Sequence, residues 1–285
     1  MTCPLCAHRA AAEIAAATDG RLLRCGACAL AYSHPPRRTE RVREEYEVVY
    51  AEPGAAARTA ERRRHVFAEF FEHVRPEGDA RLLDIGCGTG EFVLQACAHG
   101  WLATGLDLSP RAAALARARG ADARTDWEGL PAGGFQAITL WNVVEFLERP
   151  LDTLGDVQRL LAPGGRVFVR TPNERFQLAV YRWRGRVAWC RPLARALGDA
   201  YYFHPLLWGP ATLAGLLARA GFTGVRLWNS RPTAGDPYHA RSPQREAAIH
   251  VAKRLVHAWA RGAGALTRGR VLVGSSLSAL GRKPG

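Results

Sequence analysis

Residues 84–90, Asp-Ile-Gly-Cys-Gly-Thr-Gly, follow a short apolar run and precede a stretch with helical periodicity. Glycines at this density allow the backbone to turn sharply between a strand and a helix, and they allow a ligand to approach the main chain closely. The spacing is G-x-G-x-G, which differs from the G-x-G-x-x-G of dinucleotide sites, and the sequence contains no P-loop pattern. The loop predicts a ligand site at the end of a strand, with an NAD site or a structural turn as the alternatives.

Around this loop the chain alternates between short apolar runs and stretches with helical periodicity. The expected strands lie at 82–85, 102–108, 121–124, 135–141, 166–171, 224–228 and 271–282, and the expected helices at 90–99, 109–119, 150–161 and 210–220. This alternation is typical of βαβ units, so the sequence predicts an α/β fold with a parallel sheet and helices on both faces. Two inserts, 175–208 and 231–269, interrupt the pattern, and the second is expected to contain a long helix near 243–261.

Acidic residues follow the next two strands, at the edge where the carboxyl ends of parallel strands meet. Asp107 ends the second strand, where its carboxylate can accept hydrogen bonds from both hydroxyls of a ribose. Asp126 and Trp127 follow the third strand, where they can accept from the amine of an adenine and stack on its ring. Together with the glycine loop, these residues predict a pocket for an adenosine attached to a cationic group rather than to a pyrophosphate.

The motifs over residues 81–230 resemble those of the class I S-adenosylmethionine-dependent methyltransferases. L-L-D-I-G-C-G-T-G-E-F looks like the first motif of this family and G-L-D-L-S like the second. D-W-E-G-L-P is similar to the third motif, F-Q-A-I-T-L-W-N-V-V-E-F-L to the fourth, and L-L-A-P-G-G-R-V-F-V-R-T-P-N to the stretch into the fifth strand. The resemblance implies a Rossmann-like methyltransferase domain over residues 81–285, with parallel strands and a last antiparallel strand.

The resemblance also implies which residues hold S-adenosylmethionine. Asp84 would fix the glycine loop and face the amino group of the cofactor, and Trp141 and Asn142 would flank its methyl group. The implied cofactor site consists of Asp84, Gly86, Cys87, Gly88, Gly90, Asp107, Leu108, Asp126, Trp127, Trp141 and Asn142. Two positions depart from the family pattern. Gln136 stands where relatives often have Asp, and Phe146 stands where many have His, so metal-assisted catalysis is not expected.

Four of the seven cysteines form two C-x2-C pairs near the start of the chain. One Zn²⁺ can be surrounded by the four thiolates of Cys3, Cys6, Cys25 and Cys28. A segment this small needs a stabilising cross-link such as a bound metal in order to fold. Four thiolates leave no open position on the metal, which favours a structural role over a catalytic one. We therefore predict a zinc ribbon over residues 1–35, with chance cysteines or a redox pair as the alternatives.

Residues 36–80 are expected to form an N-terminal helical segment, with charged helices at 38–50 and 55–75. The order of ribbon, helices and domain resembles a bacterial subgroup of methyltransferases in which a Y-x3-Y helix, here with Tyr46 and Tyr50, precedes the domain. In that subgroup a stretch like F-H-P-L-L-W-G-P-A-T-L-A-G-L-L-A-R-A-G-F follows the fifth strand.

His204 is the candidate general base if the acceptor is a hydroxyl group. A positioned base increases the rate roughly 10²–10⁴-fold. The resemblance implies that the insert 175–208, which contains His204, lies over the methyl group. A structural histidine or a hydrogen-bond donor to the substrate is the alternative. We expect the acceptor between this insert and the carboxyl ends of the fourth and fifth strands, because ligands of open α/β sheets bind at that edge.

Positive charge is concentrated in the C-terminal part of the chain. Residues 1–174 carry 21 basic and 23 acidic residues, a net charge of −2, whereas residues 175–285 carry 18 basic and 3 acidic residues, a net charge of +15. This asymmetry predicts an anionic partner for the C-terminal part. Segments 176–187 and 243–261 have the pattern of basic amphipathic helices with Trp. Three interpretations of their basic faces are open. The helices pack on the core with their basic faces solvated, the faces bind an anionic substrate, or they contact a membrane rich in acidic lipids.

Three functions are compatible with these features. The favoured one is methyl transfer from S-adenosylmethionine to a small, anionic acceptor, such as a sugar, a lipid-linked intermediate or a specialised metabolite. An rRNA or tRNA base methyltransferase is the first alternative, although the A-L-A-Y-S-H-P-P that follows Cys28 departs from the ribbon of those enzymes. A binding module without activity is the second alternative. We expect a cytoplasmic protein, because we recognise neither a spanning apolar run nor a signal peptide; the oligomeric state stays open.

Overall fold

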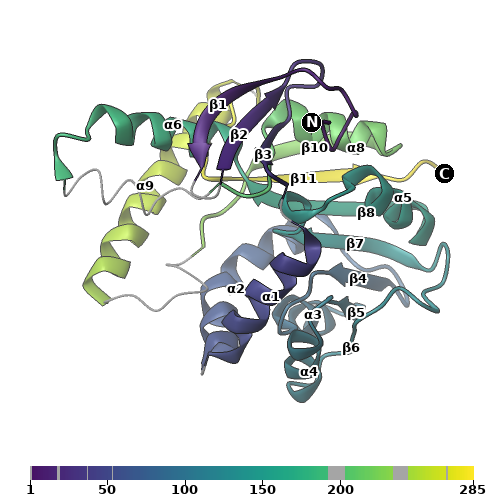
Figure 1. The fold of residues 1–285 in the computed structure, drawn as a ribbon. Helices are drawn as coiled ribbons and strands as arrows, with labels where there is room; N and C mark the ends of the chain where they lie inside the picture. Colours follow the sequence, from purple (N-terminus) through teal and green to yellow (C-terminus); the bar gives the residue numbers. More distant parts are fainter. Residues whose placement is uncertain are drawn as a thin grey trace.

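The computed structural model describes residues 2–17, 20–36, 38–52, 54–191, 203–233, 243–267 and 269–285. A seven-stranded sheet forms the centre of the molecule, and a small antiparallel sheet packs against it (Figure 1). The carboxyl ends of the central strands are the part of this fold that positions the candidate site.

The large sheet has the strand order β10-β11-β8-β7-β4-β5-β6. Its strands are β4 (Arg81–Ile85), β5 (Leu102–Leu106), β6 (Ala123–Arg124), β7 (Phe135–Trp141), β8 (Leu161–Pro172), β10 (Thr223–Asn229) and β11 (Ser276–Arg282). The strands from β6 to β8 run parallel, whereas β11 pairs antiparallel with both β8 and β10. The predicted sheet of parallel strands with a last antiparallel strand is confirmed.

Helices cover both faces of this sheet, as the alternating pattern predicts. These helices are α2 (Ala55–His73), α3 (Glu91–Ala98), α4 (Pro110–Ala118), α5 (Pro150–Leu160) and α8 (Pro210–Arg219). One core cluster joins Phe70 of α2, Phe92 of α3 and Phe168 of β8. A second cluster joins Leu154 of α5 and Leu213 of α8. Because both faces are buried, the central strands are almost entirely apolar.

Three element boundaries differ from the predictions by five residues. β8 begins at Leu161, before the expected strand start at residue 166, and so contains the Pro-Gly-Gly of residues 163–165. The pairing with β7 shifts register between Phe135 and Ala137, and Gly164 has a φ of 74°, so the start of β8 is an irregular strand. The last strand, β11, is shorter than expected, and α9 (Pro243–Leu266) continues beyond the predicted helix end.

The N-terminal residues form a second, antiparallel sheet with the order β1-β2-β3-β9. Its strands are β1 (Ala11–Ala17), β2 (Gly20–Cys25), β3 (Ala31–His34) and β9 (Leu206–Leu207). β9 comes from the insert 175–208 and pairs with Ala31 and Tyr32 of β3. Leu30 of the ribbon and Leu83 of β4 belong to the same hydrophobic cluster, so the ribbon and the large sheet share a core.

The predicted N-terminal helical segment consists of α1 (Thr39–Ala51) and α2. The aromatic side of α2 packs on the large sheet: the ring centroids of Phe67 and Trp141 lie 4.9 Å apart, and those of Phe70 and Phe92 lie 5.5 Å apart. These contacts hold α2 beside the end of β7, where Trp141 is the last residue.

The two inserts contribute α6 (Glu174–Arg186) and α9, which project from the same side of the molecule, at the left of Figure 1. Residues 192–202 and 234–242 of the inserts lie outside the described residues. In the part of the chain that the structure describes, no helix has both the length and the apolar character that crossing a membrane requires.

Candidate cofactor pocket and metal centre

A cavity of about 360 Å³ lies at the carboxyl ends of β4, β5 and β7, with α1 and α2 as its outer wall. The lining from the strand ends and loops comprises residues 84–89, Glu91, Phe92, 106–109, Trp127, 141–143, 146–149 and Thr153. The lining from the two helices comprises Thr39, Val42, Arg43, Tyr46, Tyr50, Arg63 and Phe67. A volume in this range is typical of small-molecule sites.

The glycine loop between β4 and α3 requires residues without side chains. Gly86 and Gly88 have φ angles of 71° and 54°, a region that other residues rarely adopt. A Cβ atom on Gly86 would lie 2.4 Å from Cγ2 of Val143, and one on Gly88 would lie 2.9 Å from the hydroxyl of Tyr50. The loop therefore keeps its bare backbone at the cavity wall.

Asp107 ties the loop after β5 to the glycine loop. Its Oδ2 accepts a hydrogen bond from the N–H of Gly88 at 2.8 Å, and its Oδ1 accepts one from the N–H of Ser109 at 2.9 Å. Burial raises the pKa of Asp107, while these two hydrogen bonds lower it. Ser109 also caps α4 and donates to Glu47 of α1. The predicted ribose partner is therefore fixed beside the glycine loop.

Asp84 places a buried carboxyl group on the cavity wall. Its Oδ1 accepts a hydrogen bond from the hydroxyl of Thr139 at 2.6 Å. Burial raises the pKa of Asp84 to about 8, and the neighbouring carboxylates of Asp107 and Glu91 act in the same direction, while Thr139 and Arg63 lower it. A cation bound next to Asp84 would favour its ionised form. This residue therefore fits the amino group of an amino-acid ligand.

The structure places most of the predicted cofactor residues on the cavity wall. Those that line it are Asp84, Gly86, Cys87, Gly88, Asp107, Leu108, Trp127, Trp141 and Asn142. Gly90 lies behind the loop, where a Cβ atom would meet that of Ala121 at 2.8 Å. Asp126 is exposed, and its carboxylate accepts from Arg124 and from the N–H of Glu128, both at 3.0 Å. Gly90 and Asp126 thus shape the loops around the cavity without lining it.

A buried polar network holds Asn142 at the end of β7. Asn142 has a φ of 59°, which is uncommon for a residue with a side chain. Its amide donates to Glu145 at 3.0 Å, and its carbonyl oxygen accepts from Arg170. Thr171 donates to the other carboxylate oxygen of Glu145 at 3.0 Å, and burial raises the pKa of Glu145 to about 7. The network fixes the backbone turn at the cavity wall.

His204, the candidate base, does not line the cavity. Its ring packs edge-on against Phe146, with a centroid distance of 5.2 Å, and Phe146 itself lines the cavity. Phe146 belongs to η1 (Val144–Phe146), the short helix after β7, and its ring also contacts Tyr46 of α1. His204 thus lies one side chain behind the wall, and its role as a base stays a prediction.

The N-terminal helices supply site residues that the sequence patterns do not assign to the site. Arg43 and Tyr46 of α1, Arg63 of α2 and Arg149 before α5 all line the cavity. The three- and four-residue spacing of Arg43, Tyr46 and Tyr50 on one helix face is the signal that points to them. None of the described residues of the insert 175–208 lines the cavity, because its strand β9 pairs with the ribbon instead.

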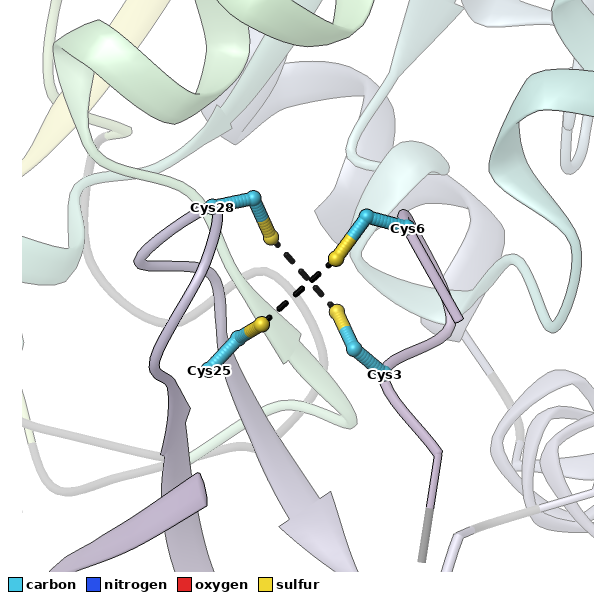
Figure 2. A group of neighbouring side chains, drawn as sticks. All are labelled: Cys3, Cys6, Cys25 and Cys28. Atoms are coloured by element: carbon cyan, nitrogen blue, oxygen red, sulfur yellow. Dashed lines mark hydrogen bonds between the residues drawn. The ribbon is translucent and has the colours of Figure 1, made fainter. Parts of the chain in front are cut away.

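The four predicted zinc ligands meet at one end of the ribbon (Figure 2). Their Sγ atoms all lie within 4.8 Å of one another, and the pairs Cys3–Cys28 and Cys6–Cys25 are 3.5 Å apart. In a tetrahedral zinc site with sulfur ligands at about 2.3 Å, the sulfur atoms are about 3.8 Å apart. The four thiols therefore fit one zinc ion, and they would fill all four of its coordination positions.

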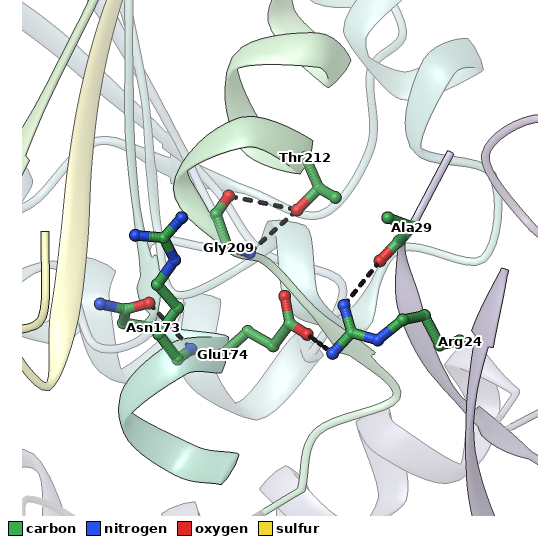
Figure 3. A network of polar contacts seen from close by, with 7 residues as sticks. Arg24, Ala29, Asn173, Glu174, Gly209 and Thr212 are labelled. Atoms are coloured by element: carbon green, nitrogen blue, oxygen red, sulfur yellow. Dashed lines mark hydrogen bonds and ion pairs between the residues drawn. The ribbon is translucent and has the colours of Figure 1, made fainter. Parts of the chain in front are cut away.

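An ion pair joins the ribbon to the start of α6 (Figure 3). Arg24, next to Cys25 in β2, donates to the carbonyl of Ala29 at 3.3 Å and to the carboxylate of Glu174. Burial raises the pKa of Glu174, and the charge of Arg24 lowers it. The first residue of α6 is thus bound to the turn that carries two of the four cysteines.

Trp208 continues this connection to the cavity. Its carbonyl accepts a hydrogen bond from the N–H of Glu174 at 3.0 Å. Its indole N–H, which is fully buried, donates to the carbonyl of Val144 at 3.1 Å. Val144 begins η1, whose last residue, Phe146, lines the cavity. The ribbon and the cavity wall therefore belong to one hydrogen-bonded framework.

Comparison with known sequences matches residues 57–227 to a family described as "Methyltransferase domain". The chain is 29% identical over 157 residues to a ubiquinone biosynthesis O-methyltransferase of Aromatoleum aromaticum, covering 52% of this chain and 65% of that protein. It is 34% identical over 137 residues to a malonyl-[acyl-carrier protein] O-methyltransferase of Erwinia pyrifoliae, covering 45% of this chain and 52% of that protein. The chain thus spans between half and two thirds of the length of these curated relatives.

Solved structures share the fold. A SAM-dependent methyltransferase of Thermotoga maritima superposes with a TM-score of 0.51 at 17% identity, covering 86% of this chain and 97% of that chain. A methyltransferase solved with the Haloferax volcanii Trm112 activator gives a TM-score of 0.54 at 17% identity, covering 85% and 98%. Since the family match spans more than half of the chain and the sheet has the expected topology, this chain belongs to the methyltransferase domain family and has the class I fold of S-adenosylmethionine-dependent methyltransferases.

Proposed function

We propose that this protein transfers the methyl group of S-adenosylmethionine to a small-molecule acceptor. The observation that carries the proposal is the placement of Asp84, Asp107 and the glycine loop on the wall of one cavity, in a chain of the methyltransferase family. When bound, the cofactor supplies a methyl group activated by its sulfonium. The protein's own contribution is to bind, orient and exclude water.

Each part of the cofactor has a partner of suitable chemistry on the wall. Asp84 would hold the amino group, and the guanidinium of Arg63 would take the carboxylate of the same amino-acid portion. Asp107 accepts two backbone hydrogen bonds and keeps lone pairs for the ribose hydroxyls. Trp127 would stack on the adenine, and Asn142, fixed by its buried network, would flank the methyl group.

The cavity wall favours a small acceptor over a folded RNA. The helices α1 and α2 cover the carboxyl ends of the strands, and Tyr46 and Tyr50 line the wall. The described residues of the strongly basic helices α6 and α9 do not line it. The basic surface and the cavity are therefore separate features. Both curated relatives are named O-methyltransferases, which supports an oxygen acceptor.

An anionic acceptor suits the charges on the wall. Arg43 and Arg149 line the cavity in addition to Arg63. Two of the acidic lining residues have partners within the chain, since Glu91 pairs with Arg119 and Glu148 accepts from the N–H of Thr39. Arg149 itself pairs with Asp152 at 2.6 Å, but both side chains are exposed, and an exposed pair of this kind is weak. The guanidinium groups are thus suited to a phosphate or a carboxylate on the acceptor. For a hydroxyl acceptor, a base role for His204 requires the ring of Phe146 to rotate out of the way.

The test is methyl transfer from labelled S-adenosylmethionine to two pools, small metabolites and total RNA. Label should enter the metabolite pool, and Asp107→Ala should reduce its incorporation at least tenfold. Replacing Arg43 and Arg149 together by Gln should raise the Michaelis constant for the acceptor and leave cofactor affinity unchanged. Label found only in RNA would support the nucleic-acid alternative, and no transfer to either pool would contradict the proposal.

A further inference from the structure

The long helix α9 presents large apolar side chains to solvent along one side. Val251, Leu255, Trp259 and Leu266 are 57%, 67%, 65% and 88% exposed. At about 100° per residue, these four positions fall within an arc of about 80° around the helix axis. They form a continuous apolar stripe, which we call the α9 stripe.

The opposite side of α9 is attached to the body of the protein. Ala260 is fully buried, and its carbonyl accepts a hydrogen bond from the amide of Asn229 in β10 at 2.9 Å. A Cβ atom on Gly264 would already lie 3.5 Å from the same amide. Small residues therefore let this side of the helix lie close to β10. The helix is held with its stripe turned outward.

Positive charge flanks the α9 stripe. Arg254 and Arg261 are exposed and lie about 60° to 80° from its Val251 edge. The sequence from residue 247 to residue 285 contains no Asp or Glu, so no carboxylate from this segment neutralises them. An apolar stripe with Trp beside arginines is the arrangement of helices that lie in the plane of an anionic membrane surface.

Exposed tryptophans also occur at α6, which projects from the same side of the molecule as α9 (Figure 1). Trp183 is 57% exposed and Trp189 is 84% exposed, and the guanidinium of Arg186 lies over the ring of Trp183 at 5.7 Å from its centroid. The amphipathic indole ring is favoured at the level of lipid headgroups. This side therefore combines aromatic anchors with arginines at two helices.

We propose that the α9 stripe, together with the tryptophans at α6, binds the surface of bilayers that contain anionic phospholipids. The stripe would enter the boundary between headgroups and acyl chains, and Arg254 and Arg261 would contact lipid phosphates. The charge of this part of the chain is complementary to such a surface. A nucleic acid offers the same phosphates but no apolar layer for Leu255 and Leu266, so the bilayer is the better match.

The experiment is flotation of the full-length protein with vesicles of phosphatidylglycerol and phosphatidylcholine, compared with vesicles of phosphatidylcholine alone. The wild type should bind only the anionic vesicles, and salt should weaken the binding. Leu255→Glu should weaken it at least tenfold, whereas Leu102→Glu, at a 57% exposed leucine that begins β5, should not. Arg254→Gln and Arg261→Gln should each weaken it about fivefold, the factor that corresponds to one charge at such a surface.

Several results would overturn the proposal. Equal binding to both vesicle types would show that the arginines do not select anionic lipids. Full binding by Leu255→Glu with an unchanged melting temperature would show that the stripe does not enter the bilayer. Binding of a single-stranded RNA probe without vesicle binding would assign the basic face to nucleic acid. A wild-type dimer that Leu255→Glu dissociates, again without vesicle binding, would assign the stripe to a second copy. None of these readouts depends on methyl transfer, so they are separate from the proposed function.

Discussion

The cysteine cluster and the cofactor cavity are both assembled from short motifs at strand–loop junctions, but only one of them is complete within the chain. In the cluster, the sulfur atoms of four cysteines lie within 4.8 Å of one another. In the cavity, Asp84, Asp107 and the glycine loop surround an open space of about 360 Å³. A metal with four protein ligands stabilises a fold, whereas an open wall of polar groups requires a ligand from outside. We therefore expect the two sites to respond differently to mutation.

The largest effect of a mutation is expected on S-adenosylmethionine binding at the cofactor cavity. Gly86→Ala should weaken S-adenosylmethionine binding roughly 100-fold, because the new Cβ would lie 2.4 Å from Val143 at the cavity wall. Gly133→Ala is the matched control, since Gly133 has a similar φ of 65° and no heavy atom within 4 Å of a built Cβ. Calorimetric titration compares the two variants. Equal affinities would place the glycine loop outside the cofactor site.

Mutation of the cysteine cluster should lower the stability of the fold rather than the affinity for S-adenosylmethionine. Cys3→Ser should abolish stoichiometric zinc and lower the melting temperature by about 10 °C, because the ribbon shares its core with the large sheet. The folded variant should bind S-adenosylmethionine within about threefold of the wild type, because none of the four cysteines lines the cavity. Cys97→Ser, at an exposed cysteine, serves as the control. Metal analysis that finds a full zinc ion in Cys3→Ser would refute the assigned ligand set.

A smaller effect is expected at the ion pair that joins the ribbon to α6. The side chain of Glu174 is 7% exposed and that of Arg24 is 35% exposed. Glu174→Gln should therefore lower the free energy of unfolding by about 1–3 kcal/mol, since it removes the charge that compensates a partly buried guanidinium. Arg21→Gln breaks the exposed pair with Glu13 and should cost less than about 0.5 kcal/mol. Denaturant titration that ranks these two variants the other way would show that Arg24 and Glu174 do not couple the regions.

The most subtle effect is a pH dependence that Asp84 gives to the ligand-free protein. Burial raises the pKa of Asp84 from 3.8 to about 8. The folded state thus binds more protons than the unfolded state between these values, and the contribution of Asp84 to the free energy of unfolding falls as pH rises through this window. Asp84→Asn should flatten the plot of the free energy of unfolding against pH, whereas Asp126→Asn, at an exposed carboxylate, should not. Identical slopes in the wild type and Asp84→Asn would mean that other groups set the pH dependence.

The sequence predicts those features whose signal is local. The glycine loop needs only a strand, a turn and a helix that follow one another, and β4 and α3 flank it in the structure as expected. The two cysteine pairs likewise lie in tight turns that bring their sulfur atoms together. The residues of the glycine loop are close in sequence. The two cysteine pairs are farther apart, but the tetrahedral geometry of a zinc site with four thiolates predicts that they meet.

Features that depend on long-range pairing could not be predicted in the same way. β9 is only two residues long, and its pairing with the ribbon has no periodicity to reveal it. Arg24 and Glu174 meet across 150 residues of sequence. This pairing draws the insert 175–208 to the ribbon, which leaves the outer wall of the cavity to α1 and α2.

Titration with S-adenosylmethionine is the most direct test that the cavity is a cofactor site, because it measures cofactor binding without knowledge of the acceptor. We predict one site per chain, and a loss of roughly 1.5–3 kcal/mol in Asp107→Ala, the range for a lost hydrogen bond to a charged group. Asp122→Ala, at an exposed carboxylate that accepts from Thr104, should bind like the wild type. Equal affinities of the wild type and Asp107→Ala, or no binding by the wild type, would contradict the account.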